Sequence, residues 1–223
     1  MWRRTILTGI LLAISVVLGG PAVAVEAELE ALPTPKKTGG RPLMQCLAER
    51  HSERAFAAAP LPEQVLSNLL WAAWGINRTE AGKRTAPSAN NRQEIDLYVA
   101  RADGLYLYDA AHHALQPVLP ADVRAATGRQ EYVGTAAVNL VYVADTTRMK
   151  ATTEDQVNFY MGADTGFIAE NVYLFCASEG LACCVRAMID RDALAEIMGL
   201  HPEQRIVLAQ SVGYPAPAAE ETH

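Results

Sequence analysis

The spacing of apolar residues predicts an amphipathic helix between Pro62 and Trp74. Apolar side chains recur there at intervals of three and four residues, which places them on one helical face. Pro60 and Pro62 precede or open the run, and proline is favoured where a helix begins. Weaker patterns predict short helices over residues 120–126 and 190–199. The buried face of the first helix is predicted to be Val65, Leu66, Leu69, Leu70 and Ala73.

Two other apolar patterns predict a sheet. Residues 94–100 and 103–109 alternate apolar and polar side chains, as half-buried strands do, with Asp103-Gly104 as the hairpin turn between them. Residues 136–145 are apolar almost throughout, which is typical of a central strand. A last strand is expected within residues 204–215.

The longest predicted helix covers residues 153–179, with Thr152 or Thr153 as its N-cap and Gly180 at its end. Apolar and aromatic residues surround most of its circumference, so we expect it to be buried on nearly all sides. A single chain of this size rarely hides such a helix, whereas a homodimer interface would. Interleaved helices and strands with an early hairpin indicate an α+β fold, with a mixed or antiparallel central sheet flanked by helices.

The chain ends differ from its middle. Residues 1–24 combine two arginines, an apolar run and a small-x-small sequence, which predicts a secretory signal peptide cleaved after about Ala24 and hence a periplasmic or secreted protein. An uncleaved N-terminal anchor is the alternative. Residues 25–40 are polar and rich in Pro and Gly, as in a flexible linker, and residues 216–223 are predicted to be a disordered tail. The folded domain is expected over residues 41–215.

Charge and cysteine content narrow the function. Residues 1–24 contain two of the 19 basic residues, so the mature chain carries 17 basic and 25 acidic residues and a net charge of −8. Such a balance argues against nucleic acid as the main partner and restricts any anion site to a few placed arginines. The four cysteines have no zinc-site spacing, and we interpret them as small buried residues.

Three short segments contain candidate site residues. In "ERHSERAF", residues 49–56, an extended backbone would place Arg50, Ser52 and Arg54 on one side, where two guanidinium groups and a hydroxyl suit a phosphate or a carbonyl-rich ring. A helical backbone would disperse them over a solvated surface. In "SEGLACC", small residues follow Gly180, so backbone N–H groups there could face a planar ligand; a plain helix C-cap is the alternative.

The third segment is "GKRTAPSANNRQ", residues 82–93. Its carboxamides both donate and accept hydrogen bonds, and Lys83 and Arg84 stand just before them, so the segment could bind a polar anionic ligand. The alternative is an Asx turn that leads into the next strand.

The order of these segments resembles that of the nitroreductase family of flavoenzymes, especially the branch with the SagB/ThcOx-type dehydrogenases. The resemblance covers about residues 41–215 and includes "LLWAAWGINR", "AENVYL" and a final "VGYP". It implies a nitroreductase-like α+β fold, an intertwined homodimer and FMN bound at the subunit interface. It also implies hydride transfer between a small-molecule electron donor and a small organic acceptor, in a ping-pong reaction.

The resemblance assigns cofactor contacts residue by residue. It implies that the phosphate, the ribityl chain and the pyrimidine edge of the flavin are held by Arg50, His51, Ser52 and Arg54. Contacts from the partner subunit or the ribityl side fall on Pro87, Ser88, Asn91 and Gln93. Backbone N–H groups near the flavin N5 atom fall on Gly180, Leu181, Ala182 and Cys183. No catalytic side chain and no metal site are predicted.

One feature departs from the family pattern. Many relatives carry a Lys or Arg soon after the final strand, within the phosphate site, but "VGYPAPAAEETH" has no cation. Candidates to replace it are Arg84 and, further along the chain, Arg186 or Arg191. Two alternatives to a reductase stay open: a binding protein of this fold without redox activity, and an azoline-type peptide dehydrogenase.

Overall fold

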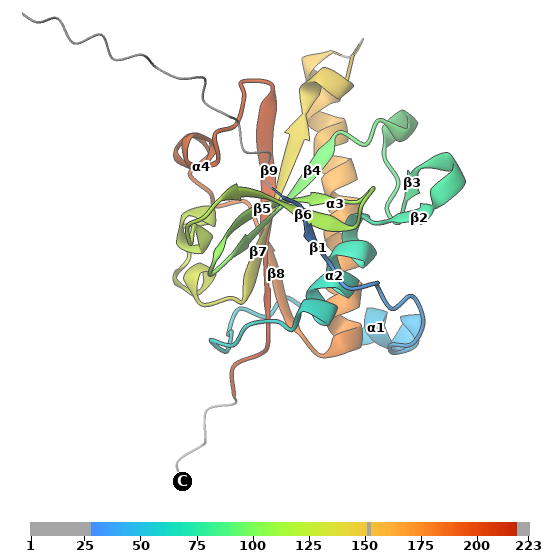
Figure 1. Cartoon of the computed structure of the whole chain (residues 1–223), viewed down its shortest axis with the longest axis vertical. Coiled ribbons are helices and arrows are strands. Elements are labelled where there is room, and N and C mark those ends of the chain that lie inside the picture. The colour runs from blue at the N-terminus through green and yellow to red at the C-terminus, as the bar shows by residue number, and fades with distance from the viewer. Residues whose placement is uncertain (1–27, 151–152, 218–223) are drawn as a thin grey trace, which may run out of the picture.

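The computed structural model describes residues 28–150 and 153–217. The predicted signal peptide and residues 218–223 lie outside this part. Within it, no helix is long and apolar enough to cross a membrane. A seven-stranded sheet and four α-helices make up most of the described chain (Figure 1).

Every strand pair in the large sheet is antiparallel, and the strand order is β1-β6-β5-β4-β7-β9-β8. The predicted central strand, β7, pairs with β4 on one side and β9 on the other, and seven of its eight residues are buried. A separate two-stranded ribbon is formed by β2 (Ile76–Arg78) and β3 (Lys83–Arg84). The strands of the large sheet are β1 (Glu30–Ala31), β4 (Ile95–Arg101), β5 (Gly104–Asp109), β6 (Ala114–Leu119), β7 (Val138–Asp145), β8 (Ala182–Arg186) and β9 (Gln204–Gly213).

The predicted long helix is confirmed as α3 (Glu154–Glu179). Thr153 and Gln156 form a capping box at its start, and Gly180 ends it in the left-handed conformation with φ 69°. The predicted helix before it is α2 (Glu63–Trp74), and the helix at 190–199 is α4 (Arg191–Met198). The sequence patterns did not reveal α1 (Leu43–Glu49).

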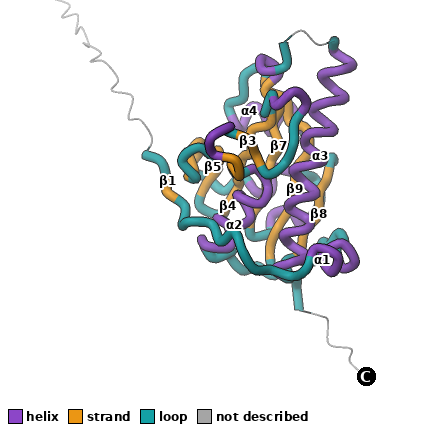
Figure 2. Tube along the Cα trace, turned by 90° about the vertical axis from the view of Figure 1, so that its right-hand side faces the viewer, coloured by secondary structure: helices purple, strands orange, loops and turns teal. Residues whose placement is uncertain are grey.

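The helices cover both faces of the sheet. Figure 1 shows α2 and α3 on one face and α4 on the other. The apolar core under α2 and α3 contains the inward side chains of β4, β7 and β9, and a second core lies under α4. Figure 2 shows α1 beside the C-terminal end of α3. This corner, where α1, α3 and β8 meet, holds two of the three predicted segments.

Three expectations about local structure are corrected. The hairpin turn is Ala102-Asp103, because Gly104 already pairs with Arg101. Residues 120–126 do not form an α-helix; a short 3₁₀ turn at Arg124–Thr127 takes its place. The helix α3 is not buried on nearly all sides within one chain, because Phe159 and Phe167 are 69% and 48% exposed.

The flexible linker predicted for residues 25–40 is wrong for its described part. Residues 28–40 form an arm that begins with β1 on the sheet edge and then crosses α2 (Figure 2). The Leu32 N–H donates to the His113 carbonyl (3.2 Å), and the Lys36 N–H donates to the Asn68 carboxamide (2.8 Å). The arm therefore has fixed contacts and delivers the chain to α1.

Candidate functional site

The segment after α1 is neither helix nor strand. Arg50 ends α1, and its N–H donates to the Cys46 carbonyl (2.8 Å). His51 is exposed, and its Nδ1 lies 2.8 Å from the Glu49 carbonyl. Arg54 is also exposed and donates weakly to the Ser52 carbonyl (3.4 Å). The segment therefore keeps two exposed basic side chains at the corner between α1 and α3.

The Tyr173 hydroxyl holds this segment against α3 and β8. Its oxygen lies 2.7 Å from Ser52 Oγ and accepts a hydrogen bond from the Val185 N–H (2.9 Å). The Arg50 guanidinium lies over the Tyr173 ring, 5.3 Å from its centroid. Burial raises the pKa of Tyr173, so the hydroxyl stays protonated and can donate to Ser52.

Two backbone N–H groups of the turn after α3 are used to cap the helix. The N–H groups of Gly180 and Leu181 both donate to the Cys176 carbonyl. The plain C-cap, one of the two alternatives for this turn, is therefore what the structure shows for these two groups. Ala182 and Cys183 belong to β8, and the Cys183 carbonyl accepts from the Glu53 N–H (2.9 Å). Contact of their N–H groups with a flavin remains a prediction.

A cavity of about 170 Å³ joins the two segments. Arg50 and His51 line it from one side and Gly180–Cys183 from the other, whereas Ser52 and Arg54, which the resemblance assigned to the same cofactor, do not line it. Arg41, from the end of the arm, also lines it, and it was not among the predicted residues. Pro215 brings the chain that follows β9 to the same place. The small side chains of Gly180, Ala182 and Cys183 and the guanidinium groups of Arg41 and Arg50 suit an anionic ligand. Two carboxylates, Glu49 and Glu53, also line the cavity.

The segment 87–93 lies elsewhere, against the middle of α3. The Ala89 N–H donates to the Asp164 carboxylate on α3 (2.8 Å), and the Gln93 N–H donates to Ser88 Oγ (3.0 Å). Pro87 is exposed. None of residues 84–93 lines the cavity beside Gly180. In one chain, this segment and the cavity are therefore separate.

Backbone angles explain the shape of this turn. Asn90, Asn91 and Gln93 have φ of 54°, 54° and 51°, in the left-handed region that Asn tolerates better than most residues. The Gln93 carboxamide also donates to the Gly82 carbonyl (2.9 Å). The segment therefore forms a short 3₁₀ turn at Ala89–Asn91 that exposes Asn91. It is not the Asx turn left open as an alternative, because within the described residues the Asn91 carboxamide oxygen accepts from the Gln93 side chain and not from a backbone N–H.

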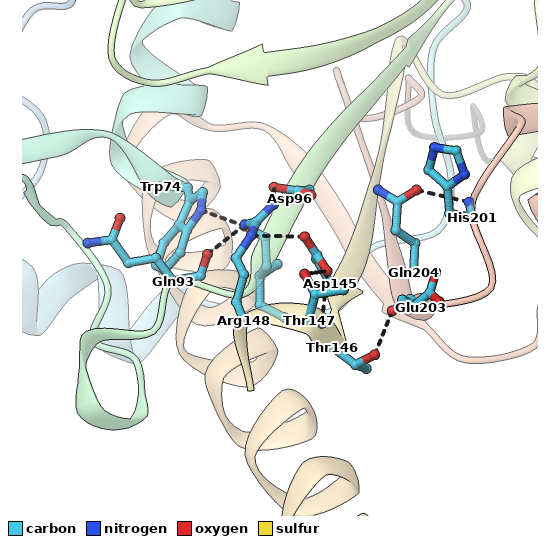
Figure 3. Close-up of polar contacts among 11 residues, drawn as sticks. Trp74, Gln93, Asp96, Asp145, Thr146, Thr147, Arg148, His201, Glu203 and Gln204 are labelled. Carbon is cyan, nitrogen blue, oxygen red and sulfur yellow. Dashed lines mark hydrogen bonds and ion pairs between the residues drawn. The ribbon is translucent and has the colours of Figure 1, made fainter. Parts of the chain in front are cut away.

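Arg148 fastens the end of this turn to the sheet (Figure 3). Its guanidinium donates to the Gln93 carbonyl (2.8 Å) and forms a fork with both oxygens of Asp96 (2.8 and 2.7 Å). A second carboxylate, Asp145, lies 3.1 Å from its Nε. Two carboxylates raise the pKa of Arg148 against the opposing effect of burial. The turn therefore has a charged anchor that the sequence motif did not contain.

A buried carboxyl group lies directly beneath the turn. Glu94 has no exposed surface, and neither of its carboxyl oxygens has a hydrogen-bond partner in the described part of the chain. Burial, and then the neighbouring Asp164 carboxyl, raise the pKa of Glu94 to about 7. Glu94 therefore titrates near neutral pH.

The three arginines considered as replacements for the C-terminal cation are engaged elsewhere. Arg84 donates to the Gln93 carboxamide (2.7 Å) and the Trp74 carbonyl (2.8 Å). Arg186 is buried and donates to Thr127 and Asn139 (both 2.8 Å), while Arg191 donates to two carbonyls of β9. None of the three lines the cavity beside Gly180.

Comparison with known proteins gives the chain its family. A model described as the nitroreductase family matches residues 47–214. The chain belongs to the nitroreductase family. The chain is also similar to MJ1384 of Methanocaldococcus jannaschii, a protein assigned as a nitroreductase. The two are 30% identical over 149 residues, which cover 62% of this chain and 75% of that protein.

Solved nitroreductases show how far the fold extends. A crystal structure from Ralstonia eutropha JMP134, assigned as a nitroreductase, is 43% identical with a TM-score of 0.82, and the match covers 92% of this chain and 97% of that one. An NADPH:FMN oxidoreductase from Vibrio harveyi is 19% identical with a TM-score of 0.58, and the match covers 78% of this chain and 69% of that one. At this identity the match shows the fold alone. The family is generally flavin-dependent, which agrees with the cations around the cavity.

The structure identifies functional candidates that the motifs did not. Arg41 precedes α1 and is the first residue of the predicted domain, directly after the predicted linker, but it was not considered as a site residue. Tyr173 was treated only as part of the long helix. Glu94 directly precedes β4, and the alternation of apolar and polar residues in the predicted strand gave no sign that Glu94 is buried. The sequence signal for Arg41 is the pair Gly39-Gly40 before it, because both glycines have positive φ and turn the arm toward α3.

Proposed function

We propose that this nitroreductase family protein is an exported FMN-dependent oxidoreductase that transfers hydride from a small-molecule donor to a small organic acceptor. The observation that carries the proposal is the shared cavity of Arg50, His51 and the Gly180–Cys183 segment. These segments are 130 residues apart in the sequence and were assigned to the same cofactor by the family resemblance. Their meeting supports FMN as the ligand.

The residues around the cavity fit the polar end of a flavin nucleotide. A cavity of about 170 Å³ is smaller than the roughly 300 Å³ typical of sites for whole drug-sized ligands, so it suits only part of FMN. Arg50, close to the chain that follows β9, suits the phosphate. The remainder would extend over the neighbouring surface, which has to be completed by another chain.

A second copy of this chain is the proposed complement. On α3, Phe159 and Phe167 are exposed on the same side as Gly162 and Gly166, and no atom lies within 4 Å of a Cβ built on either glycine. On α1, beside the C-terminal end of α3, three further apolar residues are exposed: Leu43, Met44 and Leu47. Such a surface is typical of an obligate interface. In a homodimer, the partner's Ser88–Gln93 turn would supply the contacts proposed for Ser88 and Asn91.

The protein groups bind and orient the cofactor. A bound flavin supplies the hydride chemistry. Arg50, with its guanidinium over Tyr173, holds negative charge at one end of the cavity. Gly180, Ala182 and Cys183 have little side-chain bulk, which leaves room in the cavity beside Arg50. Arg54 is free to approach the pyrimidine edge, where its charge would favour a reduced, anionic flavin.

Export is proposed from residues 1–24. The proposed cleavage after Ala24 leaves the arm that starts at Glu28 intact, so processing removes none of the described contacts. Mass spectrometry of the protein from its native host tests this proposal. A mature N-terminus at or near Val25 is expected, and a chain that retains residues 1–24 in the cytoplasm contradicts it.

The reaction is tested by two separate half-reactions. Anaerobic photoreduction of the FMN-bound protein should bleach the flavin absorbance, and a quinone or nitroaromatic acceptor should restore it in a single exponential phase. A thiazoline-containing peptide, the alternative substrate, is added separately to the protein with oxidised FMN. It should not reduce the flavin and should leave that spectrum unchanged. Reduced flavin that no small acceptor reoxidises would contradict the proposed function, and oxidation of the peptide would assign the chain to the azoline-type dehydrogenases.

A further inference from the structure

The arm brings a cation into the cavity that no family motif contains. Arg41 lines the cavity with Arg50, and its Nη2 lies 3.9 Å from a Cβ built on Gly180. The Arg41 N–H donates to Ser178 Oγ in the last turn of α3 (2.9 Å). Gly40 has φ 79°, and a Cβ there would overlap Ser178 Oγ, so glycine is required for this approach. Arg41 is therefore placed by the backbone.

The cavity also lacks the cation expected after β9. Pro215, Ala216 and Pro217 are the described residues that follow Tyr214, and none is charged. The other arginines considered for this role already donate to protein acceptors away from the cavity. In the described part of the chain, the guanidinium groups in the cavity wall are therefore those of Arg41 and Arg50.

The present partner of Arg41 is easily exchanged. Its guanidinium pairs with Glu49, and the two side chains are 44% and 43% exposed. Exposed pairs of this kind contribute little to stability, because water and salt screen the two charges. The Glu49 carboxylate also accepts from Gln45 (2.8 Å), so it keeps a partner when Arg41 turns away. Glu53, the other carboxylate in the cavity wall, accepts from backbone N–H groups of its own turn.

We propose that Arg41, together with Arg50, binds the phosphate of the flavin nucleotide and replaces the cation missing after β9. Arg41 then makes the site selective for FMN over riboflavin, and Glu49 holds Arg41 in the cavity wall until the phosphate displaces it. The inference rests on the proposed function. A guanidinium–phosphate contact is charge-assisted and desolvates little in this open cavity, so it favours the phosphorylated flavin specifically.

The test compares FMN with riboflavin in titrations of flavin-free mature protein, followed by flavin fluorescence. Arg41→Gln should weaken FMN binding about tenfold or more and change riboflavin binding less than about twofold. Arg129→Gln is the matched control, because Arg129 and Asp190 form a comparable exposed ion pair (2.9 Å) away from the cavity. It should change neither affinity.

Glu49→Gln provides the opposite change. Freed from its carboxylate partner, Arg41 should bind phosphate more tightly, and FMN affinity should rise about threefold with riboflavin unchanged. Far-UV circular dichroism checks folding, and Glu49→Gln decides the question if Arg41→Gln does not fold. Unchanged FMN affinity, or equal losses for both flavins, overturns the role of Arg41. Wild-type protein that binds neither flavin rejects the proposed function itself, which is a different outcome.

Discussion

At the residue scale, Tyr173 connects three parts of the candidate site through one hydroxyl group. It bonds Ser52 in the basic segment and the Val185 N–H in β8, while its ring supports Arg50. Tyr173→Phe should remove this partner from two half-buried groups, the Ser52 hydroxyl and the Val185 N–H, and lower the free energy of unfolding by about 1–2 kcal/mol. FMN affinity should fall as Arg50 loses its fixed position.

Urea denaturation and FMN titration check this prediction. Tyr160→Phe is the matched control, since it removes a hydroxyl from a half-buried ring on the same helix. If Tyr173→Phe behaved like Tyr160→Phe in both measurements, the hydroxyl would not position the site.

Glu94 should make the stability of the folded chain depend on pH. The pKa of Glu94 in the folded chain is about 7, above that of an unfolded glutamate, so its contribution to stability is fully present below about pH 4.5 and is lost as the pH rises through 7. Glu94→Gln should therefore raise the free energy of unfolding at pH 8 by about 1–3 kcal/mol and have little effect at pH 5. Denaturant titrations at both pH values measure it, with exposed Glu80→Gln as control. A variant with the wild-type pH profile would show that Glu94 does not titrate there.

At the element scale, α3 has an apolar side that a single chain leaves uncovered. Gly162 has open space in place of a Cβ, so Gly162→Leu should not strain the chain and should increase helix propensity. In the proposed homodimer, two α3 helices would pack at this point, and the leucine would separate them. Light scattering after gel filtration should show that the variant is a monomer. Without flavin, its melting temperature should equal or exceed that of wild-type protein that has been dissociated into single chains.

Glu196→Leu controls for the added leucine, because Glu196 is exposed on α4 at the other face of the sheet. That variant should stay dimeric. A Gly162→Leu protein that also stays dimeric would place the interface elsewhere.

The same elements show what the sequence could reveal. The periodicity of α2 and α3 and the apolar run of β7 predicted their position and type, because each pattern reports burial against one core. The patterns missed α1 and β8, since α1 has a single buried residue, Cys46, and β8 is an edge strand. Apolar residues around α3 also indicated burial and therefore predicted a homodimer interface over this helix.

Local sequence patterns could not show which distant segments meet at the candidate site. The family resemblance assigned Arg50, His51 and Gly180–Cys183 to one cofactor, and in the structure these residues line one cavity. The separation of the Ser88–Gln93 turn from this place follows from its contact with Asp164, a long-range pairing that no local pattern encodes. Arg41 reaches the cavity through two glycines and a serine on another helix, which is a tertiary arrangement.

At the scale of the whole molecule, cofactor binding and dimerisation are expected to depend on each other. A cavity that holds only part of FMN gains the rest of its contacts from the partner subunit, so the dimer should bind FMN more tightly than the single chain. FMN affinity should therefore fall on dilution below the dimer dissociation constant, and added FMN should shift the protein toward the dimer. Analytical ultracentrifugation with and without FMN measures this. If the dimer dissociation constant were the same with and without FMN, cofactor binding and dimerisation would be independent.

The absorbance spectrum of the purified mature protein tests the central claim most directly. A protein that binds FMN through Arg50 and the Gly180–Cys183 segment should be yellow, with a band near about 450 nm, one FMN per chain, and loss of the band on reduction. If the protein instead purifies colourless and takes up no FMN when the cofactor is added in excess, it is not an FMN-dependent oxidoreductase.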